Sequence, residues 1–310
     1  MSLTYRPYRD SDVPGILALW EASGWGALDE ETWRAWFQTT PSGPAIVTVA
    51  HDGEAIVGQM VFSPADVDVD GAAYRAVRLA APILHPGLRR GSARSLAHPA
   101  VRLFKTGAEA AASAGYDAIY AQPERAWLPF FRWGPIADAF RTATFGCAAL
   151  ALGGAPGADG LQARPSTGLT EAHAGLWDGA LGAFGAAAGV RRDLARLRYR
   201  LGPHLVLDVV DGDRLVGLVA VRPSDGLVMD ALAATPGALA RALAAAAAGL
   251  VDRPDVAFPA LKAMRTPAWA PALDAAGFAP DPYEFVLVVN PLTARAAALA
   301  PGGWYAAPAD

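Results

Sequence analysis

Leu79-Ala-Ala-Pro-Ile-Leu-His-Pro-Gly-Leu-Arg-Arg-Gly-Ser-Ala-Arg-Ser-Leu96 is the most informative segment of the chain. An apolar, strand-like run ends at His85-Pro-Gly87, a loop of arginines and small residues follows, and an alanine-rich helix is predicted up to Gly115. Helix-terminal N–H groups and nearby guanidinium groups direct positive charge to one place, so this layout suits a phosphate group. The helix start is open between Ser92 and Pro99, and only a start near Ser92 places helix amides beside the arginines.

The overall composition favours a two-domain globular protein with a small ligand. The chain has 310 residues, enough for two domains, and with 53% hydrophobic and 18% charged residues it is not disordered. The formal net charge is −4, which argues against a general nucleic-acid partner. The arginine loop is therefore a local feature that favours a small anionic ligand.

The single cysteine and the chain start indicate a reducing setting. Cys147 has no second cysteine for an intramolecular disulfide, and we interpret it as a buried inert thiol rather than a nucleophile. No metal site is predicted. The first residues lack an apolar signal core, and the alanine run at 231–250 contains Arg241, which favours a soluble helix. We expect a cytoplasmic protein, a monomer or homodimer without a membrane or nucleic-acid partner.

An internal repeat organises the chain. Asp52-Gly-Glu-Ala-Ile-Val-Gly58 matches Asp211-Gly-Asp-Arg-Leu-Val-Gly217, and Pro64 matches Pro223 at the same separation. Both stretches predict a hairpin of apolar strands across an Asp-Gly turn. The repeat predicts a first domain at 1–153, a glycine- and proline-rich linker at 154–168 and a second domain at 169–310.

The two halves differ at the arginine loop. In the second half the strand runs Met229-Asp-Ala-Leu-Ala-Ala-Thr-Pro-Gly237 directly into its helix, with no Arg-Gly-Ser-Ala-Arg equivalent. We infer one competent ligand site in the first half and a degenerate copy in the second.

Other parts of the second half are predicted from local pattern. A helix is expected over 177–201, and a strand over 256–261 that corresponds to the strand at 117–121. The final Trp304-Tyr305 is expected to be disordered, as chain ends commonly are, or to dock back into the first half.

Two segments resemble the GNAT-type N-acetyltransferase superfamily. Arg90-Gly-Ser-Ala-Arg-Ser95 is similar to the loop that holds the CoA pyrophosphate in that family. Gln122-Pro-Glu-Arg-Ala-Trp-Leu-Pro-Phe-Phe-Arg-Trp-Gly134 looks like the family's segment whose helix packs on CoA, with Phe130 where a tyrosine is often found. The resemblance implies an α/β (α+β) protein with two GNAT-like domains, each a mixed, mostly antiparallel, splayed sheet flanked by helices.

The resemblance also implies acetyl-CoA as co-substrate and a set of site residues. The pantetheine arm of the cofactor would lie along Pro82, Ile83 and Leu84, and Tyr120, the nearest phenol in sequence, would protonate the departing thiolate. The predicted cofactor-binding residues are Ile83, Leu84, His85, Arg89, Arg90, Gly91, Ser92, Ala93, Arg94, Ser95, Gln122 and Phe130. For the arginines the alternative is a solvated basic turn, and for His85 a turn role is favoured over a base.

Candidates for the acceptor site are weaker. Asp66, Asp68 and Asp70 alternate along a strand and share one face, where they hold a cationic amine or form a solvated hairpin. Glu21 and Glu31 fall in substrate-lining helices by position only. The tryptophans of the first half are expected in the core, with one or two walling an acceptor pocket.

The resulting hypothesis is an acetyl-CoA-dependent N-acetyltransferase that acts on a small-molecule primary amine. The alternative is a non-catalytic CoA-binding or structural tandem protein. An aminoacyl transferase would need a channel for a charged RNA, which the net charge disfavours.

Replacing Arg90 and Arg94 together by alanine is expected to weaken acetyl-CoA binding by tenfold or more. Charge-assisted contacts to a phosphate contribute roughly 1.5–3 kcal/mol, which exceeds the cost of one tenfold step. Calorimetric titration with acetyl-CoA measures the effect, and an unchanged affinity would mean that the loop does not bind phosphate.

Overall fold

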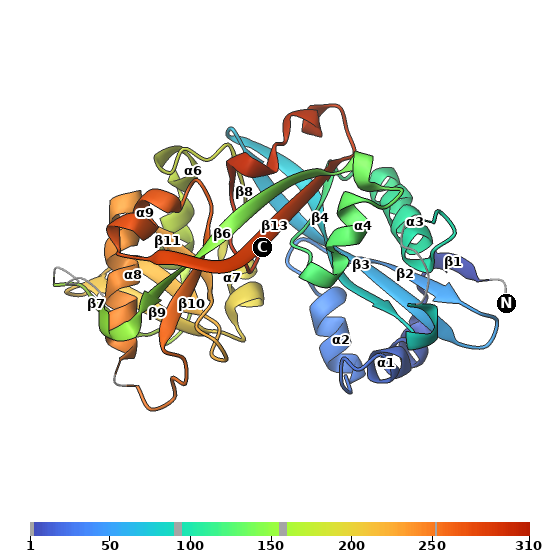
Figure 1. Cartoon of the computed structure of the whole chain (residues 1–310), viewed down its shortest axis with the longest axis horizontal. Helices are drawn as coiled ribbons and strands as arrows, with labels where there is room; N and C mark the ends of the chain where they lie inside the picture. The colour runs from blue at the N-terminus through green and yellow to red at the C-terminus, as the bar shows by residue number, and fades with distance from the viewer. Residues whose placement is uncertain (1–2, 90–94, 155–159, 252) are drawn as a thin grey trace. The chain divides into compact units, whose positions relative to one another are not determined.

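The computed structural model describes residues 3–89, 95–154, 160–251 and 253–310 (Figure 1). The chain forms two compact units, and neither is continuous in sequence. The first contains Met1–Asp66, Ala73–Thr142 and Leu287–Leu299, and the second Val67–Ala72, Ala143–Val286 and Ala300–Asp310. This division differs from the expected linear boundary at residues 153–169, because the chain passes between the units several times.

The first unit is a sheet in the order β1-β2-β3-β4-β5 followed by the end of β13. All neighbours whose register is described are antiparallel except β4 and β5, which are parallel. The strands are β1 (Thr4–Pro7), β2 (Ile46–His51), β3 (Ile56–Val69), β4 (Ala72–Leu84), β5 (Ala118–Ala121) and β13 (Ala279–Pro291). The helices are α1 (Val13–Ala22), α2 (Glu30–Phe37), α3 (Pro99–Ser113) and α4 (Leu128–Arg132), with short 3-10 turns η1 (Asp10–Asp12), η2 (Pro86–Leu88), η3 (Arg125–Trp127), η4 (Ala137–Ala139) and η7 (Arg295–Ala298).

Alternation along β2 explains how helices cover both faces of this sheet (Figure 1). Val47 and Val49 belong to the core cluster built by α1 and α2, with Trp33 and Ile83. Thr48 lies between them in sequence, and its hydroxyl donates to the carbonyl of Leu103 in α3 at 3.3 Å. Since successive strand residues face opposite ways, the apolar sequence of β2 makes it a strand buried on both faces.

The second unit contains an antiparallel sheet in the order β11-β10-β9-β7, and β6 pairs with β12. The short strands β8 and β14 pair with each other, and β8 also pairs with residues 67–69 of β3. The strands are β6 (Arg141–Ala151), β7 (Gln162–Pro165), β8 (Ala188–Val190), β9 (Leu205–Asp211), β10 (Arg214–Val221), β11 (Val228–Ala233), β12 (Ala260–Arg265) and β14 (Trp304–Tyr305). The helices are α5 (Glu171–Ala174), α6 (Ala180–Ala183), α7 (Leu194–Leu201), α8 (Pro236–Leu250) and α9 (Ala270–Ala275), with 3-10 turns η5 (Leu152–Gly154), η6 (Gly175–Trp177) and η8 (Pro301–Gly303).

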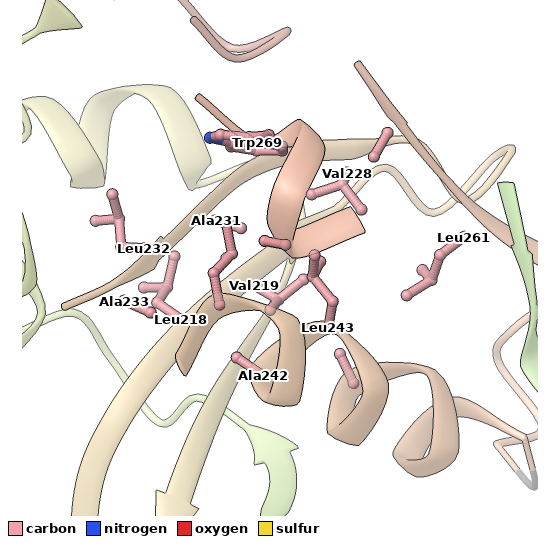
Figure 2. Close-up of a cluster of buried hydrophobic side chains, with 14 of the residues drawn as sticks. Leu218, Val219, Val228, Ala231, Leu232, Ala233, Ala242, Leu243, Leu261 and Trp269 are labelled. Carbon is pink, nitrogen blue, oxygen red and sulfur yellow. The ribbon is translucent and has the colours of Figure 1, made fainter. Parts of the chain in front are cut away.

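The core of the second unit forms where α8 packs on β10 and β11 (Figure 2). Leu218, Val219 and Leu232 of the two strands and Ala242 and Leu243 of α8 are fully buried and belong to one apolar cluster. The buried side chains of α8 are mostly alanine, and because they are short, the helix backbone lies close to the sheet.

The internal repeat is confirmed by the element order. The hairpins β2–β3 and β9–β10 are both antiparallel, and each carries a register shift at its turn end. A Cβ at Gly58 would lie 3.0 Å from Leu103, and one at Gly217 would lie 2.9 Å from Ala242. Both repeated glycines thus allow the following long helix to pack closely, which is a physical reason for their match in sequence.

The strands that follow α4 and α9 each pair with a strand from the other half of the sequence. β6 follows α4 of the first unit but pairs with β12 in the second. β13 follows α9 of the second unit, and its end pairs antiparallel with β5 in the first. Each unit therefore has an edge that is completed by the other half of the sequence.

Three local predictions are wrong. The predicted linker at 154–168 contains strand β7, because Gln162–Pro165 pairs with β9. The helix predicted over 177–201 is interrupted by β8, which pairs with β14 and β3. The strand predicted at 256–261 is Ala260–Arg265, set by its register against β6. All three depend on partners distant in sequence, which local periodicity does not contain.

The buried carboxylate of Asp117 binds the segment Leu287–Leu299 to the rest of the first unit. Asp117 accepts hydrogen bonds from Arg295 Nε at 2.6 Å, from Thr293 Oγ1 at 3.1 Å and from the backbone N–H of Arg75 at 3.0 Å. Burial disfavours ionisation of Asp117, but these donors more than offset it, so its pKa lies below the ordinary 3.8. Arg295 also stacks on Tyr74, with its guanidinium carbon 4.5 Å from the ring centroid.

Replacing Gly107 by alanine is expected to lower the free energy of unfolding by about 1–3 kcal/mol, the usual cost of overpacking. A Cβ there would lie 1.9 Å from a ring carbon of Phe62. Gly237→Ala in α8 is the matched control, because its added Cβ meets no atom within 4 Å. Urea denaturation measures both, and an equal effect of the two substitutions would contradict the packing argument.

Replacing Asp117 by asparagine is expected to cost about 2–4 kcal/mol at neutral pH, because it breaks a buried charged network. The pKa of Asp117 is lowered on folding, so its contribution is present above the ordinary 3.8 and is lost as the pH falls through the lower folded value. The wild-type advantage should therefore shrink in acid. Asp274→Asn, in an exposed pair with Arg265, is the control and should cost clearly less, because solvent screens an exposed ion pair.

Candidate functional site

A cavity opens in the first unit where two parallel strands stop pairing. The register of β4 and β5 joins Ala76 with Ala118, Val77 with Ile119 and Arg78 with Tyr120. Beyond this point the strands diverge, and a cavity of about 220 Å³ lies there. Its described lining is Trp25, Arg78, Leu79, Ala80, Ala81, Pro82, Ala121, Gln122, Pro123, Glu124, Trp127 and Phe131.

The strand wall of the cavity contains a strained residue. Ala81 has φ of 42°, in the left-handed region that costs a residue with a Cβ about 1–2 kcal/mol. The following Pro82 adds a further preference for extended backbone at Ala81. Strain of this kind persists where the surrounding structure imposes it, and it gathers at functional sites. Here it interrupts the regular backbone of β4 beside the cavity.

The other wall is aromatic. Trp25 follows α1, and Trp127 and Phe131 come from the η3–α4 segment. Phe130, which was predicted to contact the cofactor, is instead buried between neighbouring rings and does not line the cavity. Its ring lies 5.9 Å from that of Trp127 and 5.1 Å from that of Phe131, so Phe130 supports the two that do.

Two lining residues are charged. Arg78 lies where β4 still pairs with β5. Glu124 lies beyond the end of β5, is exposed, and is the acidic member of the described lining. The predicted residue Gln122 also lines the cavity.

Tyr120 does not lie where a general acid is needed. Its side chain is fully buried, and it is absent from the described lining, which begins one residue later at Ala121. The catalytic role of Tyr120 stays a prediction that this placement does not favour.

The end of β4 is structural. Ile83 and Leu84 are buried, Ile83 in the core beneath α1 and α2, and the described cavity lining ends at Pro82. His85 accepts a hydrogen bond at Nδ1 from the N–H of Gly87 at 3.3 Å, which makes it a turn residue. Of the strand residues predicted to lie along the cofactor arm, Pro82 lines the cavity, whereas Ile83 and Leu84 do not belong to its described lining.

Arg89 is engaged by the protein itself. Its Nε donates to the carbonyl of Leu84 at 3.0 Å, and its Nη2 donates to the carbonyl of Ser23 at 2.8 Å. Arg89 thus ties the residue after η2 to the end of α1, and these two bonds engage donors that a phosphate would need. The other predicted loop residues, Arg90, Gly91, Ser92, Ala93 and Arg94, lie outside the described residues. Ser95 accepts from the N–H of Ala97 at 3.2 Å, in a turn.

The long helix α3 begins at Pro99, so the start near Ser92 is wrong. Its first amides already have acceptors: the N–H of Ala100 donates to His98 Nδ1 at 3.3 Å, and those of Val101 and Arg102 donate to the carbonyl of His98. The N-terminus of α3 therefore has fewer free N–H donors for a phosphate than a helix that started near Ser92 would have, because these N–H groups already have acceptors.

The predicted acidic face is used internally. Asp68 accepts from Arg191 Nη2 at 2.6 Å and from Trp177 Nε1 at 3.1 Å. Asp66 accepts from the hydroxyl of Ser42 at 3.0 Å. Neither carboxylate lines the described cavity, and the same holds for Glu21 and Glu31. The amine-binding role proposed for the aspartates is not supported by this placement.

The second unit has a counterpart to this place. Trp127 and Trp269 both cap a short helix with proline in its first turn, and β11 corresponds to β4. Here the chain's own segment at 304–310 is inserted. Tyr305 packs edge-on against Trp269 at 5.8 Å and donates to the carbonyl of Ala231 in β11 at 2.7 Å.

A buried ionic cluster fastens the same segment, so its expected disorder is wrong. Arg192 donates to Asp230 at 3.2 Å and to Asp310 at 2.7 Å, and all three side chains are buried. The guanidinium also lies 4.7 Å from the ring centroid of Trp177. Burial, together with the Asp310 carboxylate and against the attraction of Arg192, raises the pKa of Asp230 to about 6.

The remaining predictions concern single residues and the membrane. Cys147 is buried, and burial raises its pKa to about 11, as expected for an inert thiol. Within the described part of the chain, no helix combines the length and apolar character needed to cross a bilayer.

Local sequence reasoning missed Trp25, Leu79, Ala80, Ala81 and Glu124 as site residues. The available signal was Pro82, which cannot donate to a strand partner and so marks a place where pairing stops. One or two tryptophans of the first half are predicted to line an acceptor pocket, but their spacing in sequence does not show which of them reach the cavity.

Comparison with known proteins places the fold. No protein-family model matches the chain, and no curated protein matches it. Solved structures do match. A GCN5-related N-acetyltransferase from Kribbella flavida is 15% identical over 94% of this chain and 72% of that chain, with a TM-score of 0.63. One from Anabaena variabilis is 10% identical over 94% and 73%, with a TM-score of 0.67. Eis1 from Mycobacterium abscessus is 13% identical over 95% and 74%, with a TM-score of 0.60.

Proposed function

Because the chain has the fold of the GCN5-related N-acetyltransferases, we propose that its first unit binds acetyl-CoA and transfers the acetyl group to a primary amine of a small molecule. The observation that carries this proposal is the cavity between the diverging ends of β4 and β5. A gap between parallel strands gives an extended ligand both backbone groups and apolar side chains to contact.

The residues present fit the thioester-bearing arm of CoA. Leu79, Ala80, Ala81 and Pro82 form a wall of small and apolar side chains, and beyond Arg78 the edge of β4 has no β5 partner in the described register. Such an edge offers N–H and C=O groups to a ligand that lies along it. The phosphate end of CoA would fall to the loop at 90–94, which lies outside the described residues.

Acetyl-CoA supplies an activated acyl carbon. An ammonium group first loses one proton to water, because only the neutral amine has a free electron pair. The amine nitrogen then forms a bond to this carbon while the carbon–sulfur bond breaks, so that a second proton leaves nitrogen and one is taken up by sulfur. The chain's part is to orient and polarise: a backbone N–H along β4 would donate to the thioester oxygen, where charge develops. The aromatic wall excludes water from the reacting atoms.

A specific observation favours the non-catalytic alternative as the second candidate. The described cavity lining contains no phenol, since Tyr120 is buried elsewhere and Phe130 stands in the predicted tyrosine position. A protein of this kind would bind acetyl-CoA without turnover. If the chain is an enzyme, the thiolate must take its proton from water or from another group.

The second unit is proposed as a copy without a ligand. The segment at 304–310 lies beside β11 and Trp269, at the place that corresponds to the cavity of the first unit. We therefore expect one acetyl-CoA per chain. The single cysteine and the net charge of −4 remain the basis for proposing a cytoplasmic monomer or homodimer without membrane or nucleic-acid partners.

Replacing Ala80 by tryptophan is expected to abolish acetyl-CoA binding, because the indole would fill the strand wall of the cavity. Calorimetry on the wild-type chain should give one equivalent of acetyl-CoA, and thiol release with an amine panel tests turnover. Ala108→Trp is the matched control, since Ala108 lines a separate cavity beside α3. Thermal unfolding of both variants checks the fold.

Wild-type protein that does not bind acetyl-CoA at millimolar concentration would refute the proposal. If acetyl-CoA binds but no amine of the panel causes thiol release from it, the protein is the non-catalytic alternative. Tight binding retained in a folded Ala80→Trp variant would mean that the ligand lies elsewhere.

A further inference from the structure

We propose that the acceptor is a primary amine with a single ammonium group on a flat apolar body, such as an arylalkylamine. Trp25 and Trp127 would flank its body, and Glu124 would bind its ammonium group. This inference rests on the proposed function and specifies the substrate class of the same site.

Trp25 is an exposed ring held on a rigid base. Half of its surface is exposed. Its ring packs edge-on at 5.6 Å against Trp20, which is buried, and Trp20 in turn contacts Phe37 at 6.3 Å. Phe37 contacts the fully buried Trp33 at 5.7 Å. A large apolar ring that is fixed from below and left open above loses little entropy when a ligand covers it.

Trp127 repeats this arrangement from another element. Its ring packs edge-on against the buried Phe130 at 5.9 Å, and Phe130 contacts Phe104 of α3 at 6.1 Å. Trp127 and Trp25 line the same cavity, together with Phe131. Aromatic surfaces that converge on one cavity favour a planar apolar ligand, since ring pairs add stabilisation beyond the area they bury.

The charges in the lining favour a single cation. Glu124 is exposed beyond the end of β5, whereas Arg78 lines the cavity where the two strands still pair. An ammonium group near Glu124 gains a charge-assisted hydrogen bond, and the tryptophan faces add attraction to a cation. Arg78 would repel a second ammonium group that reached the paired part of the strands.

The same lining disfavours other amine classes. A polyamine or amino sugar carries several ammonium or hydroxyl groups, and each needs a polar partner when it leaves water. The described lining offers one carboxylate and one amide side chain among mainly apolar neighbours. The aspartates that could have bound further cations pair with Arg191 or Ser42 instead.

The test compares amines as acceptors for acetyl-CoA. We expect kcat/KM for 2-phenylethylamine to exceed those for n-propylamine, spermidine and glucosamine by at least tenfold. Trp25→Ala and Trp127→Ala should each lower kcat/KM for 2-phenylethylamine by about tenfold and leave that for n-propylamine within threefold. Trp25→Phe should retain most of the preference and shows that a loss is not due to misfolding. Glu124→Gln should raise KM for all monoamines by about tenfold.

Matched controls lie outside the cavity lining. Trp133→Ala removes another exposed tryptophan, and Glu54→Gln another exposed carboxylate, and neither should change the preference. Calorimetric titration of 2-phenylethylamine onto the CoA-saturated protein gives a readout that does not need turnover, and Trp25→Ala should weaken that binding by about tenfold.

The outcomes separate this inference from the proposed function. If acetyl-CoA fails to bind, the proposed function itself fails. If acetyl-CoA binds but spermidine or glucosamine is the better ligand or acceptor, the substrate class is wrong. An unchanged preference in the folded Trp25→Ala and Trp127→Ala variants would also overturn it.

Discussion

The end of pairing between β4 and β5 is the constraint on which the rest of the first unit depends. The two parallel strands are joined through Arg78 and Tyr120, and the cavity begins at the next residues. The strain at Ala81 and the missing N–H of Pro82 both act on β4 at this point. Because β5 is held on its other side by β13, with Asp117 fastened to Arg295, it does not move over to close the gap.

The same fold is used differently in the two units. In both, a hairpin with a close-packed glycine supports a long helix that begins with proline, and a tryptophan caps the next short helix. In the first unit the space beside that tryptophan is a cavity. In the second it is occupied by Tyr305, which Arg192, Asp230 and Asp310 help to hold in place. Filling this space with the protein's own segment removes a place for a ligand and adds buried apolar surface, which stabilises the unit.

Much of the fold followed from local pattern, and much of the candidate site did not. The hairpin across Asp52-Gly53 and the helix within the alanine run at 231–250 are both visible in sequence, because turn chemistry and residue composition are local properties. The loop with Arg89 looked like a phosphate site from its composition. The structure shows Arg89 bound to two carbonyl groups, which no spacing rule reveals. Tyr120 is the nearest phenol in sequence, but its position in β5 buries it.

Two properties can be read from the order of residues alone: the chain has two related halves, and only the first half has an arginine loop after its apolar strand. These properties rest on residue type and spacing, which act over a few neighbours. Three others appear only in the folded chain: which residues line the cavity, that β6 and β13 pair with strands of the opposite half, and that Trp304 and Tyr305 are buried. The physical reason is that strand pairing and side-chain burial depend on partners far away in the chain, so they are settled only when the whole sheet has formed.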